Sequence, residues 1–294
     1  MMHATRTPTG LLCRWLEQRL ADGSAQWFTE QFEKLRRGAP ERDLYIALGY
    51  VTRRLGKADL ALTPAELDDA QTVRPGWNPG DWSIDQAARL AFVLADGMEG
   101  AAFKTRLEQL FRTADIGELI TFYRGLPLYP NPELHVARAR EGARSGMQPI
   151  FEAVAHRNPN PREQFDENAW NHMVLKALFI GSRLDPIDGL EVRANAPLMR
   201  MLCDYAHERW AAGRPVSPEL WRCVGPHADA KAIADLDRVL TTGTAVERQA
   251  AALALSAAPL AQAREVLAKN AELACAAKSG ELTWAAIANA AAPA

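Results

Sequence analysis

Apolar side chains recur every three or four residues along almost the whole chain. In the segment 166–181, for example, Trp170, Met173, Val174, Ala177 and Leu178 fall on one broad face when residues are placed 100° apart. No segment sustains the strict alternation of apolar and polar residues that predicts a half-buried strand. The pattern therefore predicts an all-α protein.

Capping residues predict where several of these helices begin and end. Thr63 precedes a proline and is followed three residues later by Glu66, which predicts a capping box at a helix start. Ser83 opens another apolar run, and Gly97 closes it. These signals predict short helices separated by tight turns.

The C-terminal stretch, residues 244–294, differs in composition, because 21 of its 51 residues are alanine. Small apolar faces permit helices to pack closely. We therefore expect antiparallel helix pairs stacked in a HEAT-like, α-solenoid-like arrangement. No fixed period of about 40 residues runs through the chain, so an irregular helical bundle is the alternative.

Two irregular stretches interrupt the helical pattern. Residues 74–82, RPGWNPGDW, combine prolines, glycines and tryptophans and are expected to form a packed loop over a helix end. Residues 157–164, RNPNPREQ, are expected to form a joint. We therefore predict an N-terminal helical half, 1–157, and a C-terminal helical half, 165–294, with one continuous domain as the alternative.

The composition is that of an ordinary soluble globular protein. Of 294 residues, 48% are hydrophobic and 24% are charged, and the net charge is −2. Such a balance supplies no strong field for nucleic acid or for an anionic membrane. The four cysteines are far apart and form no CxxC pair, so we expect a reducing compartment and no disulfide framework.

The chain also lacks the sequence signals of export and of membrane insertion. Its first twenty residues hold no long apolar run, so they do not predict a secretory signal. No stretch approaches the roughly 20 apolar residues that a membrane-spanning helix needs. We expect a cytoplasmic protein without a transmembrane segment.

Residues 165–227 hold the polar groups that are hardest to explain as helix surface. The helix 166–181 is apolar almost all round, so Asn171 should be buried, and a buried amide needs hydrogen-bond partners. We interpret Asn171 as a tie to a neighbouring turn, with ligand contact as the alternative. Lys176 lies one helical turn from His172, and the two either hold an anion or reach solvent.

The next segment, 181–195, is a turn rich in charge. Asp188 and Glu191 lie close to Arg183 and Arg193, and paired carboxylates can perform acid–base chemistry where burial separates their pKa values. A salt-bridged turn is the alternative. Asn195 should cap the following helix, whose start could receive an anionic group. The candidates for contact with a ligand or partner are Lys176, Arg183, Asp188, Glu191, Arg193 and Asn195.

Arg209 is the second structural tie that the pattern predicts. It falls on the apolar side of the helix 196–212, where a guanidinium needs a carboxylate or several carbonyls. We predict that Arg209 pairs with an acid of residues 185–191 and holds the charged turn against this helix.

Two pairs of residues have a spacing that suggests a metal site. Cys203 and His207, and likewise Cys223 and His227, are four positions apart, and two such pairs could complete a tetrahedral zinc site. Pro226 disturbs the helical geometry before His227. Two buried thiols and two surface histidines are the alternative, and we expect no metal or other cofactor.

The motifs of several large enzyme classes are absent. The chain has no GxSxG, no GxxxxGK[ST], no HExxH and no GxGxxG. We therefore predict no catalytic residues, and the sequence favours a non-enzymatic protein.

The strings NHMVLKALFIGSRLDPIDGL, DYAHERWAAGR and PELWRCV resemble the EboA family of bacterial proteins, over residues 165–225 most strongly. The resemblance implies a pathway context without a molecular activity. Members are encoded in clusters linked to processing or export of a secondary-metabolite precursor, beside a prenyltransferase-like membrane protein and several enzyme-like proteins. The family offers no catalytic residues that can be matched to this chain.

Three hypotheses of function follow. The first is a non-catalytic helical scaffold or accessory protein that holds proteins of the same cluster, or a small hydrophobic or anionic metabolite. The second is an enzyme that acts on an anionic precursor at the turn 183–193. The third is a metal-binding protein that uses the two Cys/His pairs.

Overall fold

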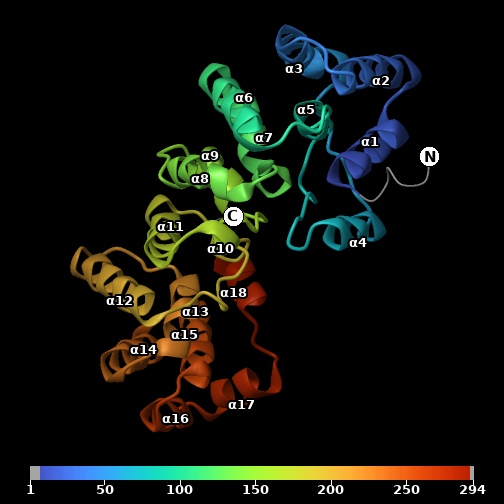
Figure 1. Ribbon diagram of the computed structural model, residues 1–294. Helices are drawn as coiled ribbons and strands as arrows, with labels where there is room; N and C mark the ends of the chain where they lie inside the picture. The colour runs from blue at the N-terminus through green and yellow to red at the C-terminus, as the bar shows by residue number, and fades with distance from the viewer. Residues whose placement is uncertain (1–6, 292–294) are drawn as a thin grey trace. The chain divides into compact units, whose positions relative to one another are not determined.

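The computed structural model describes residues 7–291, and within that range the protein consists of helices and turns (Figure 1). Eighteen α-helices and several short 3₁₀ helices are present in this part of the chain, and it contains no sheet. An isolated antiparallel bridge joins Asp59 and Ser83. The prediction of an all-α protein is confirmed.

Contacts within the chain divide it into two compact units, unit 1 (Met1–Phe165) and unit 2 (Asp166–Ala294). The helices of unit 1 are α1 (Pro8–Arg19), α2 (Asp22–Arg36), α3 (Glu41–Leu55), α4 (Pro64–Val73), α5 (Ile84–Val93), α6 (Gly100–Thr113), α7 (Ile116–Arg124), α8 (Val136–Ala143), α9 (Gln148–Ala155) and α10 (Asn160–Gln164), with the 3₁₀ helices η2 (Leu126–Leu128) and η3 (Pro132–His135). Those of unit 2 are α11 (Glu167–Ile180), α12 (Ala196–Ala211), α13 (Trp221–Val224), α14 (Ala230–Thr242), α15 (Ala245–Ala257), α16 (Ala261–Ala268), α17 (Ala271–Ser279) and α18 (Trp284–Ala291), with η4 (Pro218–Leu220) and η5 (Gly225–His227).

Residues 157–164 are more ordered than the expected joint. They end in the short helix α10, and the buried Asn158 donates hydrogen bonds to the carbonyls of Tyr123 and Ala153, both at 3.1 Å. These bonds make the segment part of the packed interior of unit 1. The division into helical halves 1–157 and 165–294 stays a prediction.

Unit 1 is built around α5, which contacts α1, α2, α3 and α7. Nine of the ten α5 residues are buried, and two of them are charged. Asp85 and Arg89 pair at 2.5 Å, and Arg89 also donates to the hydroxyl of Thr52 at 2.9 Å. A buried ion pair needs such additional partners to offset the cost of removing both charges from water.

The loop 74–82 packs as expected. Trp77 and Trp82 are buried, and the ring of Trp77 lies 5.4 Å from that of Trp15 in α1. Gln71, near the end of α4, donates to the carbonyl of Trp77 at 2.7 Å. The loop therefore covers the end of α4 and completes the core on that side.

Unit 2 is built around α15, which contacts α13, α14, α16, α17 and α18 (Figure 1). Four alanines of α15, at positions 250, 251, 252 and 254, are fully buried. A Cβ added to Gly225 would lie 2.5 Å from the carbonyl oxygen of Ala254, so backbone meets backbone at this point. In a solenoid each repeat contacts only its neighbours. The predicted solenoid-like arrangement is not confirmed.

The predicted helix starts agree with the structure. Thr63 and Glu66 form the capping box of α4, and Ser83 forms one with Gln86 at the start of α5. Asn195 caps α12 by accepting from the backbone N–H of Leu198. Local signals of this kind depend on few residues, so they can be predicted without tertiary information.

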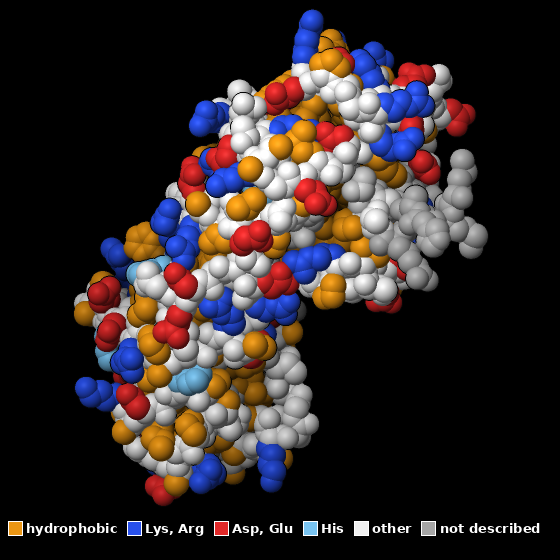
Figure 2. Space-filling model, viewed as in Figure 1, with side chains coloured by type: hydrophobic (Ala, Val, Ile, Leu, Met, Phe, Trp, Pro, Cys, Tyr) orange, Lys and Arg blue, Asp and Glu red, His pale blue; other side chains and the backbone are white. Residues whose placement is uncertain are grey.

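The surface carries both signs of charge. Figure 2 shows basic and acidic side chains interspersed over the visible face, in keeping with the net charge of −2. Within residues 7–291, no helix is both long enough and apolar enough to cross a lipid bilayer.

Candidate functional site

The charged turn between α11 and α12 is firmly packed. Gly181 ends α11 with a φ of +74°, a conformation that favours glycine, and three apolar side chains of the turn are then buried, namely Leu184, Ile187 and Leu190. These anchors hold the backbone while the charged side chains between them remain nearer the surface. The backbone of the turn is therefore held in place by buried side chains, and the charged side chains extend from it.

Arg222 of α13 organises the acids of this turn. Its Nη1 lies 2.9 Å from Oδ1 of Asp185, and its Nε donates to Oε1 of Glu191 at 2.5 Å. The side chain of Arg222 is only 14% exposed, whereas that of Glu191 is 52% exposed. One arginine thus joins the two ends of the turn to α13.

Arg209 has a different partner from the one expected. Its Nε donates to the carbonyl of Pro215 at 2.9 Å. The reason is local, because α12 ends at Ala211 and the chain reverses at Gly213, whose φ is +64°. This reversal returns the Pro215 carbonyl to the last turn of the helix, so Arg209 ties the end of α12 to the loop that follows it.

Glu219 supports the same turn from η4. It is buried, and its two carboxyl oxygens accept from the backbone N–H groups of Leu184 at 3.2 Å and Asp185 at 2.6 Å. Burial raises the pKa of Glu219 above its ordinary value of 4.5, although the two N–H donors act in the opposite direction. The sequence analysis missed both Glu219 and Arg222. The sequence feature that could have identified them is their position, since these two charged residues flank the apolar pair Leu220–Trp221.

Asn171 and Asn195 form a reciprocal pair of amides. Asn171 Nδ2 donates to Asn195 Oδ1 at 3.1 Å, and Asn195 Nδ2 donates to Asn171 Oδ1 at 2.8 Å. Because Asn195 Oδ1 also caps α12, the buried Asn171 fixes the cap and joins the two helices. The amide of Asn195, expected to face a ligand, is thereby engaged within the protein.

Lys176 and Arg193 both lie over aromatic rings of α11. The guanidinium of Arg193 is 4.8 Å from the ring centre of Trp170, and burial lowers the pKa of Arg193, although Asp166 and Glu167 act in the opposite direction. Lys176 Nζ is 5.5 Å from the ring centre of Phe179, which is 73% exposed. Aromatic side chains of α11 thus form cation–π contacts with both residues. Asp188 is half-buried within the turn.

A pocket of about 310 Å³ opens beside the turn. It lies between the end of α11, the last turns of α12, residues 215–219 and α18. Of the six candidate contact residues, Arg183 alone lines it, together with the predicted tie Arg209. Arg183 Nη2 donates to Oδ1 of Asn289 in α18 at 3.1 Å. Tertiary packing therefore brings together two arginines that the sequence analysis had assigned to different roles.

The two Cys/His pairs do not assemble into a metal centre. His207 pairs with Asp235 at 2.8 Å, and His227 Nε2 lies 2.9 Å from the carbonyl oxygen of Ala194. Burial raises the pKa of both Cys203 and Cys223 to about 12, which disfavours the thiolates that bind zinc. Between residues 7 and 291, no group of three or more His, Cys, Asp or Glu side chains could hold a metal ion. The structure therefore contradicts the hypothesis that the two pairs form a tetrahedral zinc site.

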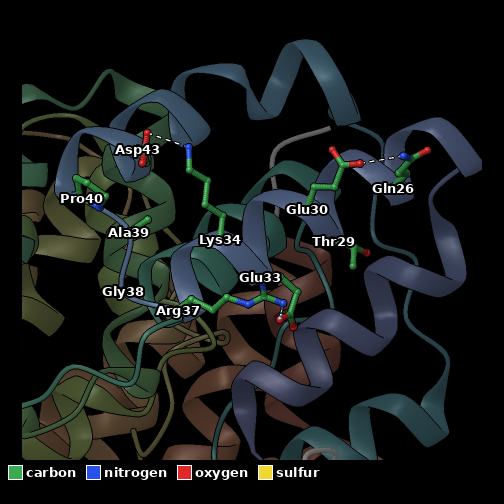
Figure 3. Close-up of a pocket in the computed structure, with 10 residues that line it drawn as sticks. All are labelled: Gln26, Thr29, Glu30, Glu33, Lys34, Arg37, Gly38, Ala39, Pro40 and Asp43. Carbon is green, nitrogen blue, oxygen red and sulfur yellow. Dashed lines mark hydrogen bonds and ion pairs between the residues drawn. The ribbon is translucent and has the colours of Figure 1, made fainter.

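A larger pocket in unit 1, about 820 Å³, lies along α2 and the start of α3 (Figure 3). Its polar side chains are engaged with one another: Lys34 pairs with Asp43 at 3.0 Å, and Gln26 donates to Glu30 at 2.8 Å. Figure 3 shows Arg37 extended toward Glu33, 3.8 Å away. Such mutual pairing accounts for the charges of this pocket without a ligand.

Comparison with protein families gives a match over most of the chain. Residues 9–225 match the model of the family described as metabolite traffic protein EboA. The matched stretch includes Arg183, Arg209, Glu219 and Arg222, and it ends before α14 to α18. No curated protein and no solved structure matches the chain.

Proposed function

We propose that this chain, which belongs to the EboA family of metabolite traffic proteins, is a non-catalytic helical accessory protein. The family description fits an accessory role in a metabolite pathway. In our proposal the chain works in the cytoplasm as a scaffold, in the processing or export of a bacterial secondary-metabolite precursor. Its partners are other proteins of the same metabolic cluster.

The engagement of the turn's acids carries this proposal. A carboxyl group that acts as a general acid or base must lie within hydrogen-bond reach of the substrate. Asp185 and Glu191 instead contact Arg222, and both oxygens of Glu219 accept backbone N–H groups. Carboxylates held in this way support the shape of the turn, which favours a scaffold over an enzyme.

Pathway output in a deletion strain tests the proposal. The strain is complemented with the wild-type chain or with an Asp188→Asn/Glu191→Gln variant, which keeps side-chain size and removes both carboxylates. We expect output close to wild type, since loss of a catalytic acid or base lowers rates by about 10² to 10⁴. A hundredfold loss at an unchanged melting temperature would contradict the proposal.

The scaffold role has its own test in the same strain. A tagged wild-type chain should co-purify with one or more enzymes encoded in the same cluster. A chain that remains a monomer without any of these proteins, while pathway output is normal, would rule out the scaffold role.

Glu219 provides the single observation in favour of the second candidate, an enzyme that acts on an anionic precursor. It is an acid with a raised pKa in a pocket that also holds two arginines, and perturbed groups of this kind often mark active sites. Glu219→Gln separates the two functions, because it removes the titrating group and keeps its size. Abolished output with an intact fold would support the enzyme, and retained output would support the accessory role.

A further inference from the structure

We propose that the pocket between α12, residues 215–219 and α18 binds a small organic anion, a carboxylate or phosphate ester attached to an apolar body. The proposal rests on the accessory function above and names the kind of metabolite that such a protein would hold. It also moves the ligand site away from the acids of the charged turn and toward Arg183 and Arg209.

The charge of the pocket lining is the first argument. Among the described residues that line it, the charged side chains are Arg183, Arg209 and Glu219. Both oxygens of Glu219 accept backbone N–H groups from the turn, so this carboxyl group is already hydrogen-bonded within the protein. The lining therefore carries two guanidinium groups and one carboxyl group, and this excess of positive charge favours an anion.

The geometry of the arginines is the second argument. Arg209 is held through Nε by the carbonyl of Pro215, and its two terminal nitrogens have no partner among the residues that the structure describes. Arg183 also lines the pocket, and its Nη2 donates to Oδ1 of Asn289 at 3.1 Å. Because Arg209 is anchored through Nε, its guanidinium loses little freedom when the terminal nitrogens bind an anion, and its planar fork matches a carboxylate or phosphate.

The uncharged residues of the lining indicate what the rest of the ligand should be. Apart from the charged groups, two serines and Tyr205, the lining is apolar, and its largest members are Leu178, Val216 and two prolines. Tyr205 also lines the pocket, and its hydroxyl donates to the carbonyl of Leu178 at 3.2 Å. A volume of about 310 Å³ is at the low end for small-molecule sites. The pocket therefore suits a short apolar chain or ring with one anionic end.

Helix α18 completes the pocket from outside the family match. Ala288 and Ala291 line the pocket, and both lie beyond residue 225. Their small side chains leave the volume open, and α18 also carries the Asn289 that positions Arg183. The anionic end of the ligand thus meets arginines inside the matched stretch, and α18 limits the size of its apolar body.

Calorimetric titration of the full chain tests the site with four probes of one chain length: hexanoate, hexyl phosphate, hexanol and hexylammonium. We expect saturable binding of at least one acid at about 1 mM and no binding of the alcohol or the amine. The tighter of the two acids identifies the anionic group as carboxylate or phosphate. Failure of both acids to bind, or equal binding of hexanol, would overturn the proposal.

Matched variants locate the binding. Arg209→Gln should weaken the preferred acid about tenfold or more, since a hydrogen bond to a charged group contributes about 1.5–3 kcal/mol and 1.4 kcal/mol is tenfold. Arg214→Gln removes the same charge at a nearby exposed position outside the lining, and we expect it to leave affinity within about twofold.

Arg183→Gln is the second test variant, in case Arg209→Gln lowers the melting temperature. Wild-type affinity in both pocket variants would overturn the assignment. Binding is measured on the purified chain without any pathway partner, so its failure would leave the accessory role standing. Conversely, loss of that role would leave a measured affinity unchanged.

Discussion

Each unit is organised around one buried helix, but α5 and α15 fill their surroundings in opposite ways. α5 buries three alanines, but it also buries large side chains such as Phe92 and an ion pair, Asp85 with Arg89. α15 uses alanines, and its backbone at Ala254 touches Gly225. Large side chains keep neighbouring helices apart and can accommodate charge, whereas small ones bring backbones together. Unit 1 should therefore be sensitive to charge removal, and unit 2 to added volume.

Arg89→Met should have the largest effect of the changes considered. It leaves Asp85 buried without its main partner, and breaking a buried pair costs about 3–5 kcal/mol of unfolding free energy. Urea denaturation of the full chain measures the loss. The double variant Asp85→Asn/Arg89→Met should recover part of it, because no unpaired charge remains. The two single variants, Asp85→Asn and Arg89→Met, are measured as well. If their losses of unfolding free energy sum to that of the double variant, an unpaired buried charge is not the cause of the destabilisation.

Gly225→Ala should destabilise unit 2 by about 2–3 kcal/mol, as overpacking of a close contact does. The added Cβ would lie 2.5 Å from the Ala254 carbonyl oxygen and 2.8 Å from its Cα, and backbone atoms cannot rotate away. Hydrogen exchange of α15 reports the change locally. Gly49→Ala is the control, since nothing lies within 4 Å of its added Cβ. Equal effects of the two substitutions would refute the steric account.

Arg222→Met tests whether charge removal matters less in unit 2. Its partners Asp185 and Glu191 are 30% and 52% exposed, so water can solvate them when the arginine is lost. We expect a loss of about 1–2 kcal/mol, between that of a surface pair and that of a buried one. Arg209→Met should cost less, since Arg209 contacts a carbonyl of its own loop. Thermal denaturation measures both losses. If Arg209→Met lowered stability more than Arg222→Met, then Arg209 and not Arg222 would be the main tie of the charged turn.

Opposite pH dependences give the smallest and most selective test. In unit 1, two hydrogen bonds from Arg19 hold the pKa of Glu66 at about 2, below its ordinary 4.5. Its stabilisation is complete above pH 4.5 and is lost as pH falls toward 2. In unit 2, burial raises the pKa of Glu219, so its stabilisation is complete below pH 4.5 and is lost as pH rises through the higher folded value.

Two isosteric variants measure these contributions. Glu66→Gln should cost about 1–2 kcal/mol at neutral pH and little near pH 2. Glu219→Gln should remove a loss of stability that the wild type shows as pH rises above 4.5. Melting temperatures recorded between pH 2 and 8 for both variants give the comparison. A pH profile of Glu219→Gln that is parallel to wild type would contradict the raised pKa.

The site was predictable only in part, and the reason lies in sequence separation. The burial of Asn171 followed from the apolar surroundings of its own helix, and the cap at Asn195 followed from its neighbours. The partner of the charged turn did not follow, because Arg222 is 37 residues from Asp185 and 31 from Glu191. Arg209 has the helical position that was expected of a tie, but the chain reverses at Gly213 and brings the carbonyl of Pro215 to its guanidinium, so it contacts no acid of the turn.

The helical class, the main helix starts and the packed tryptophan loop could be read from local pattern, because hydrophobic period and capping bonds involve residues only a few positions apart. Tertiary structure alone decided which helix became the centre of each unit, which arginine joined the acids of the turn, and which polar groups came to face a common pocket. Those outcomes depend on contacts between distant segments, and many pairings of such segments are compatible with the same local pattern. Glu219 and Asn289 illustrate the point, since both are far from Arg183 in sequence and only folding brings either of them to the pocket that Arg183 lines.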